Sequence, residues 1–245
     1  MKISDLTREV SLAMPLAFAE FDPAAAGRKT GFVIVDEVNG FVTVGAGALA
    51  PPAPDAQVAT MVSETDRIAR HFTGQNWPIL AFLDTHTSGK AEPPYPPHCE
   101  IGTGEEELVD DLKWLETDRN TTLVKKDCIN GFVGAIQKDG SNAFVDWVNA
   151  NSITDLLVVG ICTDICVMDF VLTTLSARNH DMMPTLKDIH IYESGCATYD
   201  LPRDVAVEIG QGATAAHPQE LTHYLGFYFM ASRGAKLVNK VILQS

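Results

Sequence analysis

Two cysteines separated by three residues include the most reactive side chain that the sequence offers. Cys162 and Cys166 follow an apolar run, Leu156 to Ile161. If this run is a strand that turns into a helix capped by Thr163 or Asp164, Cys166 lies in the first helical turn. The partial positive charge there favours a thiolate, and free N–H groups can hold an oxyanion. The segment predicts a cysteine nucleophile, although free cysteines are also often small buried core residues.

Two charged residues that end other apolar runs could activate this thiol. Asp36 follows Gly31 to Val35 and could take the thiol proton and later return it to a leaving group. Lys126 could hold the Asp36 carboxylate and help keep the thiolate charged. Because side chains alternate along a strand, only one of Lys125 and Lys126 can face the site. Each charge taken alone could instead face water, and no histidine lies near Cys166 in the sequence.

A second group of residues has the chemistry of a metal site. Asp84 and His86 are two positions apart at the end of a run, so both can point the same way. His98 follows a proline-rich stretch that would hold it rigidly. Carboxylate and imidazole ligands suit zinc, iron or manganese, and an open coordination position would serve a substrate or a water molecule. Glu92 is a further candidate ligand or a solvated loop charge, and Cys99 is an alternative ligand.

Alternating apolar runs and helical stretches predict the elements that carry these residues. The expected strands are Gly31–Val35, Ile79–Leu83, Thr121–Val124, Leu156–Ile161, Ile189–Tyr192 and Lys236–Leu243. The expected helices are Gln57–Thr73, Gly104–Leu115, Ser141–Asn151, Asp164–Asn179 and His217–Ser232. Continuous apolar runs are typical of strands buried on both faces. The pattern predicts one α/β domain over residues 1–245, a three-layer sandwich with a mostly parallel sheet of six strands.

The expected sheet explains why the reactive residues belong together. Asp36, Asp84, Lys126 and Cys166 follow four different apolar runs. In open α/β sheets, ligands bind outside the carboxyl ends of the strands. Four chemically useful side chains should therefore meet at one edge of the sheet, a more specific signal than any single motif.

Composition excludes several classes of function. The 245 residues carry a net charge of −14, which disfavours binding to nucleic acid. No apolar run reaches the roughly 18 residues of a membrane span, and the first residues lack the apolar core of a signal peptide. The five cysteines are an odd number, which indicates free thiols in a reducing cytoplasm.

Seven stretches of the chain match motifs of a known family. They are Asp36–Phe41, Asp84–His86 with Pro97–Cys99, Gly160–Val167, Lys126–Gly134, Gly195–Thr198 and His217–Leu221. Together they resemble the isochorismatase-like cysteine hydrolases, and among these the nicotinamidases of the plant type, over about residues 31–242. Two departures stand out: Val38 replaces a common glutamine, and Cys162 replaces the usual alanine.

The resemblance implies an activity and a role for each candidate residue. It implies hydrolysis of nicotinamide to nicotinate and ammonia through a thioester on Cys166, with Asp36 as acid/base and Lys126 as the catalytic lysine. A cis peptide between Ile161 and Cys162 would aim the backbone N–H groups of Cys162 and Cys166 into an oxyanion hole. The remaining implied roles are one divalent metal ion, with zinc favoured over iron or manganese, on Asp84, His86, Glu92 and His98, and aromatic walls at Phe41 and Tyr95.

Two other functions stay open from the sequence. One is a related cysteine amidase that acts on another small amide or carbamoyl compound. The other is a metal-binding protein without catalysis, which would use Asp84, His86 and His98. The expected partners are a small-molecule substrate and further copies of this chain in a homo-oligomer, with neither nucleic acid nor membrane.

Overall fold

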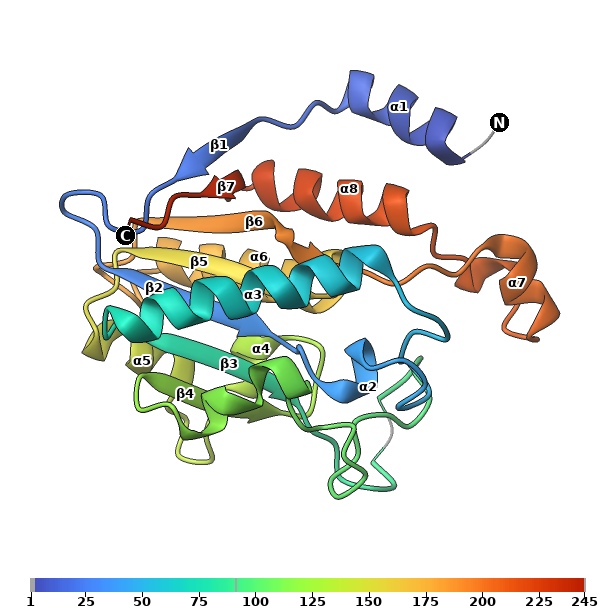
Figure 1. Cartoon of the computed structure of the whole chain (residues 1–245), viewed down its shortest axis with the longest axis horizontal. Coiled ribbons are helices and arrows are strands. Elements are labelled where there is room, and N and C mark those ends of the chain that lie inside the picture. The colour runs from blue at the N-terminus through green and yellow to red at the C-terminus, as the bar shows by residue number, and fades with distance from the viewer. Residues whose placement is uncertain (1–2, 91, 245) are drawn as a thin grey trace.

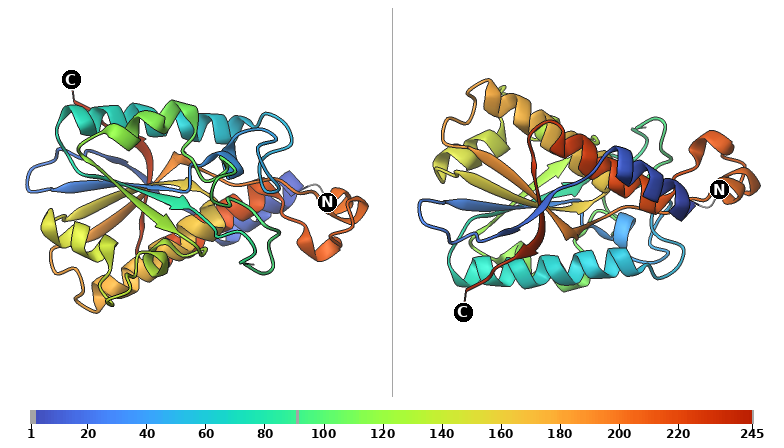
Figure 2. Two further views of the ribbon diagram at one scale, coloured as in Figure 1. Left: turned by 90° about the horizontal axis from the view of Figure 1, so that it is seen from below. Right: turned by 90° about the horizontal axis from the view of Figure 1, so that it is seen from above.

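A parallel sheet of seven strands lies between two layers of helices in the computed structural model, which describes residues 3–90 and 92–244 (Figures 1 and 2). The strands are β1 Phe18–Phe21, β2 Thr30–Val35, β3 Ile79–Asp84, β4 Thr121–Lys126, β5 Asp155–Ile161, β6 Asp188–Ala197 and β7 Lys236–Val241. Their order in the sheet is β1-β7-β6-β5-β2-β3-β4, and every neighbouring pair is parallel. The predicted fold class is confirmed, and the predicted strand count of six is one too low.

Helices of three kinds connect the strands. The α-helices are α1 Ile3–Ala13, α2 Asn39–Val42, α3 Ala56–Gly74, α4 Gly131–Gly134, α5 Ala143–Ala150, α6 Met168–Asn179, α7 Arg203–Glu208 and α8 Gln219–Ala231. The 3₁₀-helices are η1 Asp110–Thr117 and η3 Ala213–Ala215, and η2 Thr163–Val167 is a π-helical turn. Among the described residues, none of these helices has the length and apolar character that crossing a membrane requires.

Two expectations about elements were wrong. The missed strand, β1, lies at the edge of the sheet beside β7 and exposes its two middle residues, so it lacks a continuous apolar run. The expected helix Gly104–Leu115 is irregular up to Val109. Its backbone carbonyls at Glu105 and Glu107 accept hydrogen bonds from Gly40 and Asn39 at 2.8 and 2.9 Å instead of bonds within a helix.

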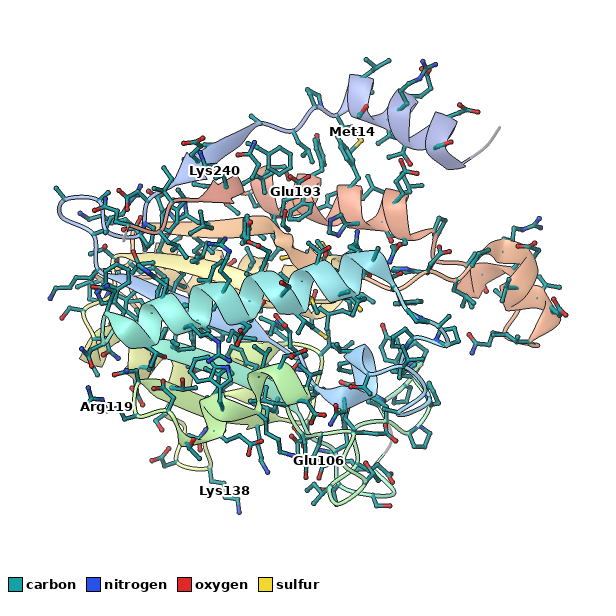
Figure 3. All side chains as sticks on the ribbon, in the orientation of Figure 1. Met14, Glu106, Arg119, Lys138, Glu193 and Lys240 are labelled. Atoms are coloured by element: carbon teal, nitrogen blue, oxygen red, sulfur yellow. The ribbon has the colours of Figure 1, made fainter. Side chains whose placement is uncertain are left out.

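The core has two halves, one on each face of the sheet. Along β2, Val33 and Val35 face the half beneath α5, α6 and α8, whereas Phe32 and Ile34 face the half beneath α3. Figure 2 shows these helix layers on opposite sides of the sheet. Charged side chains such as Arg119, Lys138 and Lys240 project from the surface (Figure 3). The central strands are therefore buried on both faces, as their apolar runs predict.

The strand order reverses between β2 and β5. From β2 the chain proceeds through β3 to β4 on one side, and from β5 through β6 to β7 on the other. Such a switch point leaves a crevice outside the carboxyl ends of the two strands. Asp36 directly follows β2 and Cys162 directly follows β5, so both residues lie at the switch point. Helix α7 projects beyond the sheet on the same side (Figure 1).

Close packing of β5 against β2 depends on a glycine. Gly160 pairs with Val35 and has a φ of 130°, which L side chains rarely adopt. A Cβ at Gly160 would lie 2.1 Å from the backbone oxygen of Val35.

We expect Gly160→Ala to lower the free energy of unfolding by roughly 3 kcal/mol or more, because the added methyl group would collide with backbone that cannot move aside. Gly74→Ala is the matched control. Gly74 ends α3 with open space around the position of a Cβ, so its substitution should change stability by about 1 kcal/mol or less. Chemical denaturation measures both variants. Equal stability of the two variants would contradict the close contact between β5 and β2.

Candidate active site

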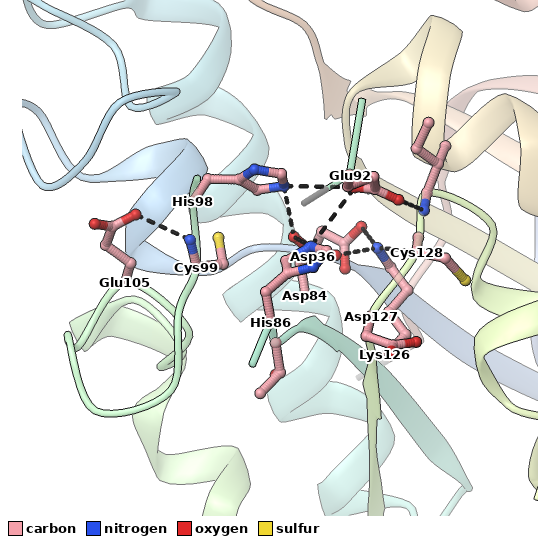
Figure 4. A network of polar contacts seen from close by, with 12 residues as sticks. Asp36, Asp84, His86, Glu92, His98, Cys99, Glu105, Lys126, Asp127 and Cys128 are labelled. Atoms are coloured by element: carbon pink, nitrogen blue, oxygen red, sulfur yellow. Dashed lines mark hydrogen bonds and ion pairs between the residues drawn. The ribbon is translucent and has the colours of Figure 1, made fainter. Parts of the chain in front are cut away.

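A buried lysine joins the two halves of the site. The Nζ atom of Lys126, at the end of β4, lies 2.8 Å from Oδ2 of Asp36 and 2.8 Å from Oδ1 of Asp84 (Figure 4). It also donates to the backbone oxygen of Cys128 at 3.0 Å. The register of β3 and β4 pairs Asp84 with Lys126, and alternation along β4 leaves Lys125 exposed. The expectation that only one of the two lysines faces the site is confirmed.

The shared ammonium gives the two carboxyl groups different proton affinities. Burial raises the pKa of Asp36 to about 7, against the opposing effect of Lys126. Burial would also raise the pKa of Asp84, but Lys126 and hydrogen bonds from two histidines hold it well below its usual range. Burial alone would lower the pKa of Lys126, yet the neighbouring acidic groups, chiefly Asp36, raise it well above its ordinary value. At neutral pH Asp84 stays ionised, whereas Asp36 can gain or lose a proton.

Local backbone geometry directs Asp36 into the site. Asp36 has a φ of 56°, in the left-handed region that non-glycine residues adopt at a cost of about 1 kcal/mol or more. The next residue, Glu37, points away from the site and accepts a hydrogen bond from Thr65 at 2.6 Å. Both oxygens of Asp36 are buried, and the neighbours that lower the pKa of the carboxyl are the Lys126 ammonium and the Cys166 thiol. The Asp36 carboxylate can accept a proton from that thiol.

The segment that carries the two cysteines, here called the cysteine turn (residues 161–167), is not the capped α-helix that the sequence predicts. It is the π-helical turn η2, in which the backbone oxygen of Cys162 accepts from the N–H groups of Ile165 and Val167 at 3.0 and 3.1 Å. No side chain caps this turn. The two expected caps, Thr163 and Asp164, hydrogen-bond elsewhere, so the cap prediction is wrong.

Those two residues fasten the cysteine turn to β6 and α8. The Thr163 hydroxyl donates to the backbone oxygen of Ala197 at 3.1 Å and lies 2.8 Å from Nδ1 of His223. The Asp164 carboxylate accepts from the Thr198 hydroxyl at 2.7 Å and lies 2.8 Å from Nε2 of His217. Sequence reasoning missed this network, because its partners lie 34 to 60 positions apart and only the motif that begins at His217 hinted at it.

Cys166 is protonated rather than a preformed thiolate. Burial raises the pKa of its thiol well above the usual range, and the nearby Lys126 offsets this only in part. Desolvation of the buried sulfur therefore opposes the stabilisation of a thiolate that was expected from the helix start and Lys126. Cys166 contacts Asp36 closely enough to lower the pKa of that carboxyl. Attack by this sulfur requires a base, and Asp36 is in position.

Backbone N–H groups border the same sulfur. The Ile161–Cys162 peptide bond is cis, as the family resemblance implies. Among the turn and loop hydrogen bonds of the described residues, none has the N–H group of Cys162 or of Cys166 as its donor. Two backbone N–H donors beside a nucleophile are the chemistry of an oxyanion hole.

The four predicted metal ligands meet beside Lys126 and are called here the acid–histidine group (Asp84, His86, Glu92 and His98). Oδ2 of Asp84 lies 3.0 Å from Nε2 of His86 and 3.2 Å from Nε2 of His98. One oxygen of Glu92 lies 3.6 Å from each of these nitrogens (Figure 4). Even without Glu92, the residues Asp84, His86 and His98 each place one ligand atom within 4.8 Å of the other two. These residues form a compact set of oxygen and nitrogen donors that suits a divalent metal ion.

Surrounding contacts orient these donors. Nδ1 of His98 lies 2.7 Å from the backbone oxygen of Pro96, which fixes the proton on Nδ1 and leaves Nε2 free to bind. Glu92 accepts the backbone N–H of Ile129 at 2.8 Å through its other oxygen, so it is anchored rather than solvated. Cys99 does not join the group; its sulfur packs against Gly40, where a Cβ would lie 2.6 Å away.

A similar set of side chains at the opposite end of the sheet is already neutralised. Asp155, Asp188 and His190 also place possible ligand atoms within 4.8 Å of one another. Asp155, however, pairs with Arg28 at 3.3 Å as well as with His190 at 3.0 Å. The arginine supplies the positive charge that a metal ion would bring, so we read this cluster as structural.

Two aromatic rings flank the acid–histidine group. The ring centroids of Phe41 and Tyr95 lie 5.6 and 6.1 Å from that of His98. Burial raises the pKa of the Tyr95 hydroxyl to about 12. Both rings therefore lie beside a histidine of the acid–histidine group, where they could contact a bound ring.

Comparisons with known proteins show which family and which folds this chain resembles. The Isochorismatase domain family matches residues 30–239. Nicotinamidase 1 of Arabidopsis thaliana is 54% identical over 228 residues, which cover 92% of this chain and 93% of that protein. The structure of a nicotinamidase from Bacillus subtilis superposes with a TM-score of 0.63 and 20% identity over 86% of this chain and 100% of its own. A pyrazinamidase of Pyrococcus horikoshii solved in complex with zinc has a TM-score of 0.61 and 18% identity over 86% of this chain and 99% of its own.

Alkylation of Cys166 by iodoacetamide should accelerate with rising pH through a midpoint near 7, because Asp36 must lose its proton before it can accept that of the thiol. In Asp36→Asn the acceleration should move to much higher pH. Glu37→Gln, which changes a buried carboxyl that faces away, should keep the wild-type profile. Mass spectrometry of the Cys166 peptide gives the rates. Overlapping profiles for Asp36→Asn and the wild type would remove Asp36 from thiol activation.

Substitutions in the acid–histidine group should reduce zinc retention to different extents. Wild-type protein dialysed against a weak chelator should keep about one equivalent of zinc. His86→Ala should lose most of it, and Glu92→Gln should lose less, because the Glu92 carboxyl also serves the N–H of Ile129. His180→Ala, which alters an exposed residue, is the control. Elemental analysis decides; full retention by His86→Ala would contradict this ligand set.

Proposed function

The chain belongs to the isochorismatase family, and from this premise we propose that it is a nicotinamidase, an amidohydrolase that converts nicotinamide to nicotinate and ammonia. One observation carries the proposal. Lys126 lies 2.8 Å from both Asp36 and Asp84, so it links a cysteine with its base to a group of metal ligands. Nicotinamide needs both parts, since its carboxamide reacts and its ring nitrogen can bind a metal. The 54% identity to a nicotinamidase over most of the chain supports the same substrate.

Proton transfer to Asp36 starts the proposed reaction. As the Cys166 sulfur attacks the carboxamide carbon, Asp36 takes the thiol proton, and the carbonyl electron pair moves onto oxygen. The N–H groups of Cys162 and Cys166 donate hydrogen bonds to that oxyanion. When the electron pair returns, the carbon–nitrogen bond breaks and Asp36 gives its proton to the departing ammonia. A thioester on Cys166 remains.

Water completes the cycle. Asp36, again ionised, takes a proton from a water molecule that attacks the thioester carbon. The carbon–sulfur bond then breaks and the proton on Asp36 returns to the Cys166 sulfur. The product leaves as nicotinic acid and releases its remaining proton to the solvent to become nicotinate. Throughout, Lys126 keeps Asp36 in place and limits the rise of its pKa to about 7, where both transfers are possible.

The acid–histidine group would hold one divalent ion, and we propose zinc, which suits its oxygen and nitrogen donors. When bound, the ion supplies a Lewis-acid contact for the pyridine nitrogen of the substrate. Phe41 and Tyr95 would pack on the ring and exclude water from it. The acid–histidine group and Cys166 lie at separate places in the site, which favours substrates that carry both a ring nitrogen and a carboxamide.

Three further expectations belong to the same proposal. Residues 1–245 form a single catalytic domain. The enzyme acts in the cytoplasm, as its odd number of free cysteines suggests. It assembles as a homo-oligomer.

Ammonia release tests this function directly. Purified wild-type protein should release ammonia from nicotinamide, whereas Cys166→Ala should lose activity by a factor of about 10⁴ or more, because the covalent step is gone. Cys162→Ala should keep substantial activity, since only its backbone N–H is proposed to act. The opposite behaviour of the two variants would overturn the nucleophile assignment.

Benzamide is the control for the ring contact. It has the shape of nicotinamide without the ring nitrogen, so it should be hydrolysed much more slowly. Equal rates on the two amides would show that a contact between the metal ion and the ring nitrogen does not select the substrate. Turnover of some other small amide alone would reject nicotinamide as the substrate.

A further inference from the structure

A cavity outside the site described above lies between β1, β6 and α8. It has a volume of ≈ 390 Å³ and is lined by residues that include Phe18 of β1, Glu193 of β6, and His223 and Phe227 of α8. In the sheet order, β6 lies on one side of β5 and the acid–histidine group on the other. Pockets of about 300–1,000 Å³ are the usual size for small-molecule sites. The cavity can therefore hold a compact ligand without overlapping the site described above.

The lining is acidic and aromatic. Glu193 and Glu220 both border the cavity, and none of its lining residues in the described part of the chain is a lysine or arginine. Glu193 is half-buried, burial raises the pKa of its carboxyl, and it has no ion pair within residues 3–90 and 92–244. Figure 3 shows Glu193 at the level of β6 and α8. A half-buried carboxylate without a positive partner is costly unless a cation approaches it.

Apolar groups form the rest of the wall. Leu16, Phe18 and Phe227 border the same space, and the rings of Phe18 and Phe227 lie edge to face with centroids 6.1 Å apart. Aromatic faces attract organic cations, and apolar walls favour a ligand with a hydrocarbon body. Hydrated inorganic ions would gain nothing from these rings.

One wall of the cavity is attached directly to the cysteine turn. His223 lines the cavity and its Nδ1 lies 2.8 Å from the Thr163 hydroxyl, three residues before Cys166. Gln219, also in the lining, donates to the backbone oxygen of Thr198 at 2.8 Å, and Thr198 in turn donates to Asp164. A ligand that shifts α8 would therefore disturb two of the contacts that fix the cysteine turn.

We propose that this cavity is a second binding site, for a small organic cation with an aromatic or apolar body, and that its occupancy alters the reactivity of Cys166. The carboxylate of Glu193 binds the positive charge, and the side chains of Phe18 and Leu16 contact the body. The contact between His223 and Thr163 carries the effect to the cysteine turn.

Calorimetric titration with benzylammonium tests the binding site, with benzyl alcohol as the neutral control of similar shape. Wild-type protein should bind benzylammonium at least about tenfold more tightly than benzyl alcohol, and Glu193→Gln should remove that preference. Glu208→Gln, an exposed change on α7 outside the cavity, should leave it intact. Equal binding of the two probes by the wild type, or an unchanged preference in Glu193→Gln, would overturn the proposal.

The coupling has its own readout, which does not require turnover of nicotinamide. Saturating benzylammonium should change the rate of Cys166 alkylation at least about twofold in the wild type and in Glu208→Gln, but not in Glu193→Gln. A rate that stays the same in all three proteins, with binding present, would overturn the link through His223. Because neither measurement uses the hydrolytic reaction, failure here is distinguishable from failure of the proposed function.

Discussion

The whole site depends on one buried ammonium that two carboxylates share. Lys126 lies fully inside the protein between Asp36 and Asp84, at 2.8 Å from each. Removing one member of a buried ion pair costs about 3–5 kcal/mol, because a charge is left without compensation. Here the three charges sum to one negative charge, so the group as a whole favours a proton or a cation nearby. A proton on Asp36 and a metal ion beside Asp84 both meet that need, which couples the reacting half of the site to the ligand half.

Desolvation, rather than a helix dipole, decides how the thiol is used. Burial keeps Cys166 protonated, and the π-helical cysteine turn has no side-chain cap. A thiol of this kind reacts only when a base takes its proton, and Asp36 has the raised pKa that such a base needs at neutral pH. The strained backbone at Asp36 is consistent with that function, since left-handed conformations in non-glycine residues gather at active sites.

Sequence patterns predicted what rests on local periodicity and missed what rests on distant contacts. Runs such as Leu156–Ile161 are strands because their apolar side chains fill both faces of the sheet, and the rule about carboxyl ends then brought Asp36 and Lys126 together. β1 was missed because an edge strand needs no continuous apolar run. The expected helix after Gly104 failed because its backbone bonds to residues 39 and 40. The bond between Asp164 and His217 spans 53 positions, and no spacing rule anticipates it.

The most direct measurement is the titration of the Asp36 carboxyl itself. Infrared difference spectra of the wild type, with Asp36→Asn as the reference, isolate the carbonyl band of the protonated group across the pH range. The account predicts that this band disappears with a midpoint near pH 7. A midpoint near the ordinary aspartate value of about 4 would contradict it, because Asp36 could not then hold a proton for the leaving ammonia at neutral pH.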